Sequence, residues 1–204
     1  MRIVICLLLL HLLPAWAANA HANGVILIMG DSLSMGYGIS KEESWPALLQ
    51  QRLDQLGYRY RVANASISGD TSHGGLSRLP KTLSREKPSI VIIALGANDG
   101  LRGLRLQDTT DNLEQMTVLS QESGAKVLLL GIQLPYNYGQ TYRERFHRIY
   151  AQIAQKKHTA IVPFFLQGVA ETRAMMQPDG LHPSATAQPA ILENVWRKLL
   201  PLLN

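Results

Sequence analysis

The chain has 204 residues, a length that favours one domain or at most two small ones. Hydrophobic residues make up 46% of it and charged residues 17%, which is typical of a globular protein with a sizeable core and excludes a largely disordered chain. The formal net charge is +5, but the basic residues are dispersed. Nucleic-acid binding needs a contiguous basic patch, so we expect no nucleic-acid partner and at most transient contact with an anionic membrane surface.

Residues 1–22 have the pattern of a signal peptide. Arg2 precedes the apolar run "IVICLLLLHLL", which is too short to span a bilayer comfortably, and "PAWAANAHA" then offers Ala-x-Ala pairs for cleavage between residues 17 and 22. An uncleaved anchor is the alternative. Cys6, the only cysteine, falls in this segment, so the mature chain is expected to have neither a disulfide nor a thiol nucleophile. We expect a periplasmic or secreted protein whose residues 23–204 form a single domain.

Five short apolar runs alternate with longer segments of helical period. Such runs are typical of strands buried on both faces of a parallel sheet. They are residues 25–29 (VILIM), 60–64 (YRVAN), 89–95 (SIVIIAL), 125–132 (AKVLLLGI) and the weaker 159–165 (TAIVPFF). The alternation predicts a three-layer α/β domain around a parallel sheet, with the active site at the carboxyl ends of the strands.

Helices are predicted over residues 44–57, 108–122, 140–157 and 184–200. In the first of them, Ser44 is the expected N-cap and Gly57 the stop. Its buried face is predicted to consist of Leu48, Leu49, Leu53 and Leu56. Pro189 is expected to bend the last helix.

Polar residues follow the strand ends. Ser32 comes directly after the first strand, and a serine hydroxyl needs a base within hydrogen-bond reach to become a nucleophile. His182 is the best candidate, because Asp179 precedes it by three residues in a turn and Pro183 restricts its backbone. The carboxylate could orient the imidazole and stabilise the imidazolium that forms when the serine proton is taken.

Acyl transfer also needs donors aimed at the developing oxyanion. The backbone N–H of Ser32, the unhindered N–H of Gly69 and the side-chain amide of Asn98 follow the first, second and third strands. Gly69 or Asn98 alone would be explained by turn chemistry. Three donors after three consecutive strands predict an oxyanion hole.

Four blocks of the sequence, in order, resemble the SGNH, or GDSL, hydrolases. They are Gly30-Asp31-Ser32-Leu33-Ser34, Gly69, Gly96-Ala97-Asn98-Asp99 and Asp179-Gly180-Leu181-His182. The stretches "NASISGDTS", "GANDGLRG" and "LPYNYG" are similar to a branch of bacterial periplasmic enzymes with thioesterase, lysophospholipase and arylesterase activities. The likeness extends over essentially the whole chain after the signal segment.

The resemblance implies a flavodoxin-like fold of five parallel strands with helices on both faces. It implies a serine hydrolase that cleaves acyl esters and thioesters through an acyl-enzyme intermediate. Ser32 would be the nucleophile, His182 the base and Asp179 its partner. The implied oxyanion donors are those reached above from the strand ends, namely Ser32, Gly69 and Asn98.

In such hydrolases the loop after the second strand, similar to residues 66–80 here, is expected to move over the acyl chain. Gly74 and Gly75 would give it mobility, and His73, which the family pattern does not predict, would lie on it and tune its position by protonation. Apolar side chains near the strand ends and this loop predict a shallow acyl-chain groove. They are Leu76, Leu79, Leu134, Tyr136 and Tyr138.

The substrate stays open between an acyl ester, a thioester and a lysophospholipid. One alternative is a carbohydrate esterase specific for acetyl groups, which needs only a small acyl pocket. Another is an inactive relative that binds lipid or glycan, although the presence of Ser32 and His182 argues against it. The chain has no Gly-x-Ser-x-Gly elbow, metal-binding motif or phosphate cradle, so no cofactor is expected. A monomer is expected, because no exposed heptad or long unpaired strand edge is apparent.

Overall fold

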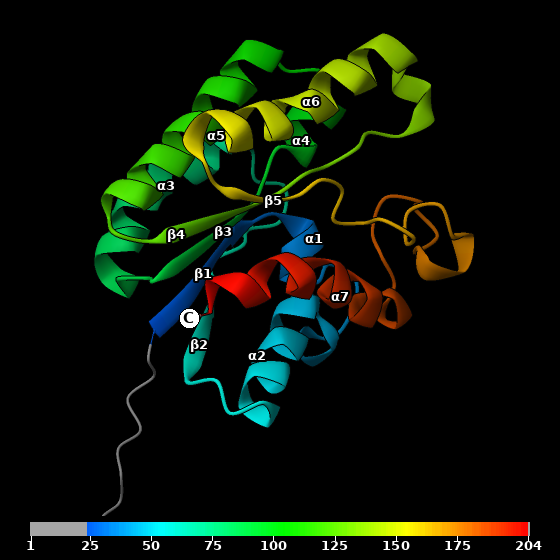
Figure 1. Ribbon diagram of the computed structural model, residues 1–204. Helices are drawn as coiled ribbons and strands as arrows, with labels where there is room; N and C mark the ends of the chain where they lie inside the picture. Colours follow the sequence, from blue (N-terminus) through cyan, green and yellow to red (C-terminus); the bar gives the residue numbers. More distant parts are fainter. Residues whose placement is uncertain (1–23, 204) are drawn as a thin grey trace, which may run out of the picture.

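The computed structural model describes residues 24–203, and its centre is a five-stranded sheet (Figure 1). The strands are β1 (Gly24–Gly30), β2 (Tyr60–Asn64), β3 (Ile90–Ala94), β4 (Lys126–Leu130) and β5 (Ala160–Val162). Their order is β2-β1-β3-β4-β5, and every neighbouring pair is parallel. The five strands predicted from the apolar runs are therefore confirmed. The predicted signal peptide lies outside the described residues.

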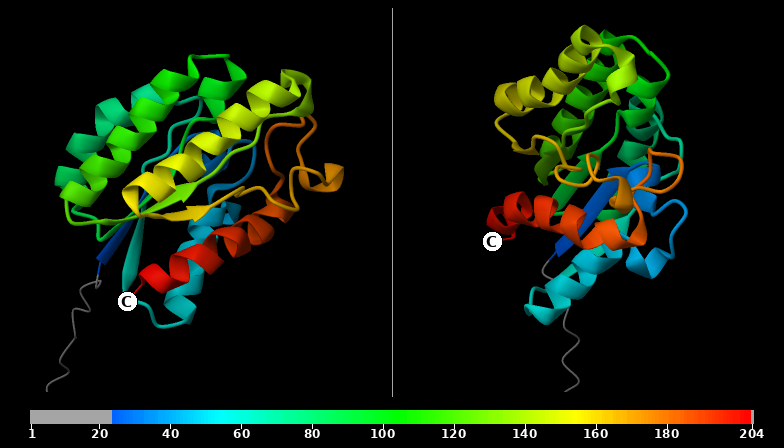
Figure 2. Two further views of the ribbon diagram at one scale, coloured as in Figure 1. Left: turned by 45° about the horizontal axis from the view of Figure 1, so that its top comes forward. Right: turned by 90° about the vertical axis from the view of Figure 1, so that its right-hand side faces the viewer.

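Helices cover both faces of the sheet, which confirms the three-layer α/β fold. They are α1 (Ser32–Met35), α2 (Trp45–Gln55), α3 (Ser72–Glu86), α4 (Ala97–Leu101), α5 (Leu106–Glu122), α6 (Gln140–Lys157) and α7 (Gln188–Leu199). Short 3₁₀ turns are η1 (Lys41–Glu43), η2 (Tyr136–Tyr138), η3 (Arg173–Met175), η4 (Ala185–Ala187) and η5 (Leu200–Leu202). Helices α3, α5 and α6 lie side by side over one face, and α2 and α7 lie over the other (Figures 1 and 2). None of the helices in the part of the chain that the structure describes is long and apolar enough to cross a membrane.

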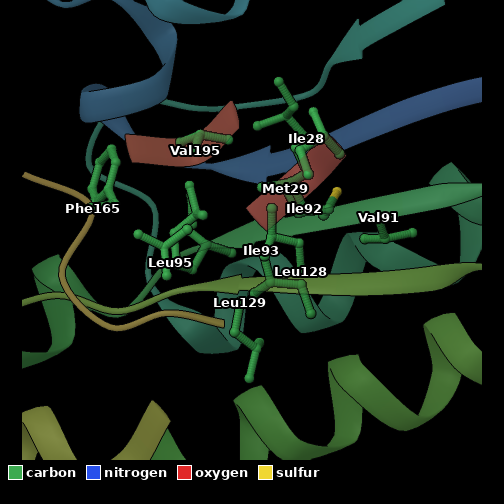
Figure 3. Packing of buried hydrophobic residues seen from close by; sticks show 14 of the residues in the cluster. Ile28, Met29, Val91, Ile92, Ile93, Leu95, Leu128, Leu129, Phe165 and Val195 are labelled. Atoms are coloured by element: carbon green, nitrogen blue, oxygen red, sulfur yellow. The ribbon is translucent and has the colours of Figure 1, made fainter. Parts of the chain in front are cut away.

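The core is built on the central strands. All five residues of β3 are buried, and Ile92 pairs in register with Ile28 of β1 and Leu128 of β4. Figure 3 shows these side chains packed with Phe165 and with Val195 of α7. Each Ile or Leu side chain buried in this way contributes about 1.5–3 kcal/mol to the free energy of unfolding. Because helices cover both faces of the sheet, side chains on both faces of each strand are buried, and the apolar runs are continuous rather than alternating.

The register of the sheet places the ends of its first three strands together. Gly30, the last residue of β1, pairs with Ala94, the last residue of β3, and Asn64 at the end of β2 pairs with Ile28 of β1. Because β1 lies between β2 and β3, the three loops that follow these strands emerge at one edge of the sheet.

Two predicted details of the helices are wrong. Leu56 is 58% exposed, because α2 ends at Gln55 and Leu56 is its C-cap, while Leu49 and Leu53 are fully buried as expected. Pro189 does not bend the last helix, since α7 starts at Gln188 and the proline occupies its first turn. A proline there is tolerated because the N–H it lacks would have no partner within the helix.

The segment predicted as a mobile loop over residues 66–80 is a helix from Ser72 onward. Thr71 caps α3 by accepting a hydrogen bond from the Gly74 N–H at 3.3 Å. A Cβ at Gly75 would collide with the Leu95 side chain, so this glycine allows α3 to approach the end of β3 closely. Gly74 and Gly75 therefore belong to a packed helix and not to a hinge.

Candidate active site

Ser32 lies at a sharp strand-to-helix turn. Asp31 is the N-cap of α1, and its Oδ1 accepts a hydrogen bond from the Leu33 N–H at 3.0 Å. Ser32 is thereby the first residue of a helix that follows β1 directly, with 8% of its surface exposed. Its backbone N–H has no acceptor within the helix and remains available to a substrate atom.

The structure brings Ser32, His182 and Asp179 together. His182 Nε2 lies 2.9 Å from Ser32 Oγ, and His182 Nδ1 lies 2.6 Å from Asp179 Oδ2. The other oxygen of Asp179 accepts hydrogen bonds from the backbone N–H groups of Leu181 at 2.9 Å and His182 at 3.0 Å. Asp179 therefore holds both the ring and the backbone of His182.

The hydrogen bonds around Asp179 keep its carboxylate ionised. Burial alone would raise its pKa, but the hydrogen bonds from the His182 ring and from the backbone of His182 and Leu181 outweigh that effect and lower the pKa to about 2. An ionised carboxylate at Nδ1 fixes the tautomer in which Nε2 can accept the proton of Ser32.

The predicted oxyanion donors are anchored at the same edge of the sheet. Asn98 stands in the first turn of α4, and its Nδ2 donates to the Asp70 carbonyl at 2.9 Å and lies 3.4 Å from Asp31 Oδ2. Gly69, with φ +76°, belongs to the turn closed by the Asp70 N–H donating to the Ile67 carbonyl. The Ile67 N–H in turn donates to the Gly30 carbonyl at 3.1 Å, which attaches this turn to the end of β1.

Asp31 is a buried carboxyl group that the sequence did not reveal. It is fully buried behind Ser32, and burial raises its pKa to about 7, with a smaller contribution from the nearby Asp70 and Asp99; the hydrogen bond from Leu33 opposes the shift. The Gly-Asp-Ser pattern indicated a turn but not the burial of its carboxyl group, which depends on residues distant in the sequence.

Two further polar groups support the edge of the sheet and were also missed. Arg78 of α3 forms an ion pair with Asp70 at 2.9 Å and donates to the Ala65 carbonyl, so it holds the loop that carries Gly69. Asp99, 2% exposed, accepts hydrogen bonds from the backbone N–H and the hydroxyl of Ser72 and thereby ties α4 to the start of α3. The bonds from Arg78 to the Ala65 carbonyl and from Ser72 to Asp99 join residues 13 and 27 positions apart, so no local sequence pattern predicts them.

The predicted acyl groove is only partly consistent with the structure. Leu79 and Leu134 are 0% and 3% exposed in the core, so the prediction that they line a groove is wrong. Leu76 packs against the core and is partly buried, Tyr138 donates its hydroxyl hydrogen to the Leu101 carbonyl, and Tyr136 is 82% exposed.

Exposed apolar side chains that the prediction did not include occur on three segments at this edge of the sheet: beside His182 (Tyr37), just before it in sequence (Leu181), and in the turn bonded to the end of β1 (Ile67). Tyr37 is 51% exposed and its ring lies 4.5 Å from that of His182, Leu181 is 41% exposed, and Ile67 is 51% exposed.

His73, predicted to lie on a mobile loop, is exposed on the first turn of α3 and lines a cavity of about 670 Å³ together with Asp108 and Asp111 of α5.

Comparison with known proteins identifies the family. A model of the GDSL-like lipase/acylhydrolase family matches residues 28–188. The chain belongs to this family and is a hydrolase, which confirms the resemblance found in its sequence blocks.

Two relatives and one solved structure are similar to the chain over most of its length. It is 53% identical over 198 residues to esterase TesA of Pseudomonas aeruginosa, with 97% of this chain and 96% of that protein covered. It is 44% identical over 186 residues to thioesterase 1/protease 1/lysophospholipase L1 of Escherichia coli K12, with 91% of this chain and 88% of that protein covered. A crystal structure of TesA matches with a TM-score of 0.86 at 55% identity, covering 87% of this chain and 99% of that one.

Proposed function

We propose that this chain removes acyl groups from esters and thioesters, with Ser32 as nucleophile, His182 as base and Asp179 as the residue that orients the base. One observation carries the proposal: an unbroken series of hydrogen bonds runs from Ser32 Oγ through both imidazole nitrogens to Asp179. Membership of an acylhydrolase family supports the same reaction class.

In the first half of the reaction, Nε2 of His182 takes the proton of Ser32 Oγ as this oxygen attacks the carbonyl carbon. The carboxylate of Asp179 stabilises the resulting imidazolium. When the tetrahedral intermediate collapses, the bond from carbon to the leaving oxygen or sulfur breaks, and Nε2 gives its proton to the leaving alcohol or thiol. In the second half, water repeats these steps on the acyl-enzyme and releases the carboxylic acid and free Ser32.

The negative oxygen of the tetrahedral intermediate would be held by the N–H groups of Ser32 and Gly69 and by the amide of Asn98. The bond from Asn98 to the Asp70 carbonyl fixes the plane of this amide. A substrate oxygen would replace Asp31 Oδ2 as the acceptor of its second, longer bond of 3.4 Å. Such preorganised donors stabilise the transition state without reorganisation during the reaction.

The substrate we favour carries an acyl chain longer than acetyl, as in lysophospholipids, aryl esters and acyl thioesters. Exposed apolar side chains support this choice, because an acyl chain gains free energy by covering them. They are Tyr37 against His182, Leu181 just before His182, and Ile67 in the turn bonded to the end of β1. The relatives named as esterase and as thioesterase/lysophospholipase support it as well.

We also propose that the protein is exported and acts as a monomer, on acyl compounds at or outside the cell envelope. The signal-peptide pattern of residues 1–22 supports this location. N-terminal sequencing of the protein from a periplasmic fraction should give a first residue between 18 and 23. An intact Met1 on membrane-bound protein would contradict export with cleavage.

The experiment that tests the reaction is hydrolysis of p-nitrophenyl esters from acetyl to palmitoyl by the mature protein and by Ser32→Ala. We expect activity that peaks at medium or long chains and is lost in the variant. Activity confined to acetyl would instead favour the carbohydrate deacetylase. Hydrolysis that survives in Ser32→Ala would contradict the proposed nucleophile, and an inactive mature protein would favour a lipid- or glycan-binding relative.

A further inference from the structure

His182 lies on a long irregular segment. Between the end of β5 at Val162 and the start of α7 at Gln188, only the 3₁₀ turns η3 and η4 interrupt the loop (orange in Figures 1 and 2). A base on such a loop must be held in place by specific contacts, because a displacement of about 1 Å can lower the rate 100-fold.

Gln177 holds this loop at its base. Its backbone N–H donates to the His182 carbonyl at 2.8 Å, and its side-chain Nε2 donates to the Pro183 carbonyl at 3.0 Å. Met176 and Pro183 form an isolated antiparallel bridge beside these bonds. The six residues from Gln177 to His182 are therefore closed into a small loop, with Asp179 at its turn.

The same side chain attaches this loop to the segment that follows the nucleophile. Gln177 Nε2 also donates to the Tyr37 carbonyl at 2.7 Å. The Gln177 amide lies so close to Gly38 that a Cβ there would collide with it, and Gly38 has φ +74°. Only glycine adopts this conformation and leaves this space readily, so the chain after α1 is shaped to receive the Gln177 side chain.

The side chain of Tyr37 contacts His182 directly. Its ring lies 4.5 Å from the imidazole of His182, at an interplanar angle of 37°. An aromatic face near an imidazole that becomes positively charged during the reaction stabilises that charge and restricts rotation of the ring. Asp179 fixes one edge of His182 through Nδ1, and Tyr37 packs against its face.

We propose that Gln177 and Tyr37 are positioning residues that hold His182 against Ser32. Gln177 joins the loop of His182 to the segment after α1, and the tilted ring of Tyr37 packs against the imidazole. Neither takes part in proton transfer, so Gln177 is expected to affect kcat through His182 rather than substrate affinity. Tyr37 is also a surface that the acyl chain would cover. Its part in holding His182 is therefore judged from kcat, with Leu and Phe replacements that keep an apolar side chain there. This inference rests on the proposed function, because it assigns His182 the role of base.

The test compares Gln177→Glu, Tyr37→Leu and Tyr37→Phe. Gln177→Glu keeps the shape of the side chain but replaces the donor to the Tyr37 and Pro183 carbonyls with an oxygen that repels them. We expect its kcat to fall about 10- to 100-fold with KM within about twofold of wild type. We expect Tyr37→Leu to lower kcat about three- to tenfold and Tyr37→Phe, which retains the aromatic face, to restore most of that loss.

A second readout removes the influence of ester binding. Diethyl p-nitrophenyl phosphate phosphorylates Ser32 as its oxygen–phosphorus bond forms, p-nitrophenolate leaves and His182 takes the proton. Its rate constant should fall in parallel with kcat in Gln177→Glu and Tyr37→Leu. If the two residues act through the same loop, the double variant should lose less than the product of the single losses.

Matched controls lie elsewhere in the fold. Gln121 Nε2 also donates to a backbone carbonyl, that of Lys157, and Tyr58 packs edge-on against Trp196. Gln121→Glu and Tyr58→Leu should retain wild-type kcat even if their melting temperatures fall. Any of three results would overturn the proposal. Gln177→Glu could be as active as Gln121→Glu, Gln177→Glu could change KM and leave kcat unaltered, or Tyr37→Phe could be as impaired as Tyr37→Leu. Failure of the proposed function would look different, because Ser32→Ala would then retain the activity of the unmodified protein.

Discussion

The two halves of the candidate active site are held in different ways. Ser32 and Asn98 stand in the first turns of α1 and α4, directly after the central strands β1 and β3, and β3 is buried along its whole length. His182 and Asp179 lie in a loop fixed by a few hydrogen bonds near the surface. Substitutions in the sheet should therefore reduce stability, whereas substitutions in the loop should reduce activity.

The largest expected effect belongs to the loop. His182→Gln removes the proposed base, and we expect kcat to fall by about 10⁴-fold or more, equivalent to over ~5 kcal/mol in the activation free energy. Since His182 is near the surface, the melting temperature should change little. Ester hydrolysis and thermal unfolding of the same preparation measure both quantities.

His73→Gln is the control for this variant. His73 is exposed on α3, so its replacement should leave kcat and the pH–rate profile unchanged. An altered profile would revive the idea that protonation of His73 tunes a moving segment. Activity retained by His182→Gln would instead mean that another group takes the serine proton.

The next effect belongs to the strand end. The pKa of Asp31 is raised from 3.8 to about 7, so between these values the folded state binds a proton that the unfolded state has released. Stability should therefore fall as pH rises from about 4 to 7, by up to ~4 kcal/mol for this group, and then stay level. Asp31→Asn keeps an N-cap and cannot ionise, so its stability relative to wild type should improve between pH 5 and pH 8.

Chemical denaturation of both proteins at several pH values tests this prediction. Asp108→Asn is the control, because the Asp108 side chain is 56% exposed. A stability difference between Asp31→Asn and wild type that does not change with pH would show that Asp31 is ionised throughout this range.

Substitution of Asn98 is expected to reduce both activity and stability. Asn98→Ala removes one proposed oxyanion donor and should lower kcat about 10²- to 10³-fold, equivalent to about 3–4 kcal/mol in the activation free energy. It also removes the bond to the Asp70 carbonyl, which should cost about 1 kcal/mol of stability. Asn112→Ala, which removes a similar amide from the Ser72 hydroxyl, should show only the stability loss. Equal kcat losses in both variants would argue against a specific role for Asn98.

The sequence predicted the sheet well because its signal is local. Each strand of a sheet covered on both faces, such as Ile90–Ala94, must be apolar at nearly every position. The polar residues that follow each apolar run are therefore easily identified in the sequence. Ser32, Asn98 and Gly69 were selected as candidates in this way, and Asp179 and His182 because they share one turn.

The parts that were missed depend on contacts between distant residues. The family resemblance predicted a mobile loop over residues 66–80, with Gly74 and Gly75 giving it mobility, but the cap at Thr71 and the fit of Gly75 against Leu95 allow a helix there. The bond from Gln177 to the Tyr37 carbonyl joins residues 140 positions apart, and no local sequence pattern predicts it. The burial of Asp31 is hidden for the same reason.

The smallest predicted effect tests the sheet half alone. Ile92 is fully buried in the middle of β3, where it pairs with Ile28 and Leu128. Ile92→Val removes one methylene and should cost about 1 kcal/mol, or about 2–4 °C in the melting temperature. Because the substitution lies two residues before the carboxyl end of β3, kcat at 25 °C should remain that of wild type. Ile161→Val on the edge strand β5, where the side chain is only partly buried, should cost less. If Ile92→Val lowered kcat as strongly as a substitution in the His182 loop, the geometry of Asn98 would depend on core packing, and the two halves would not be independent.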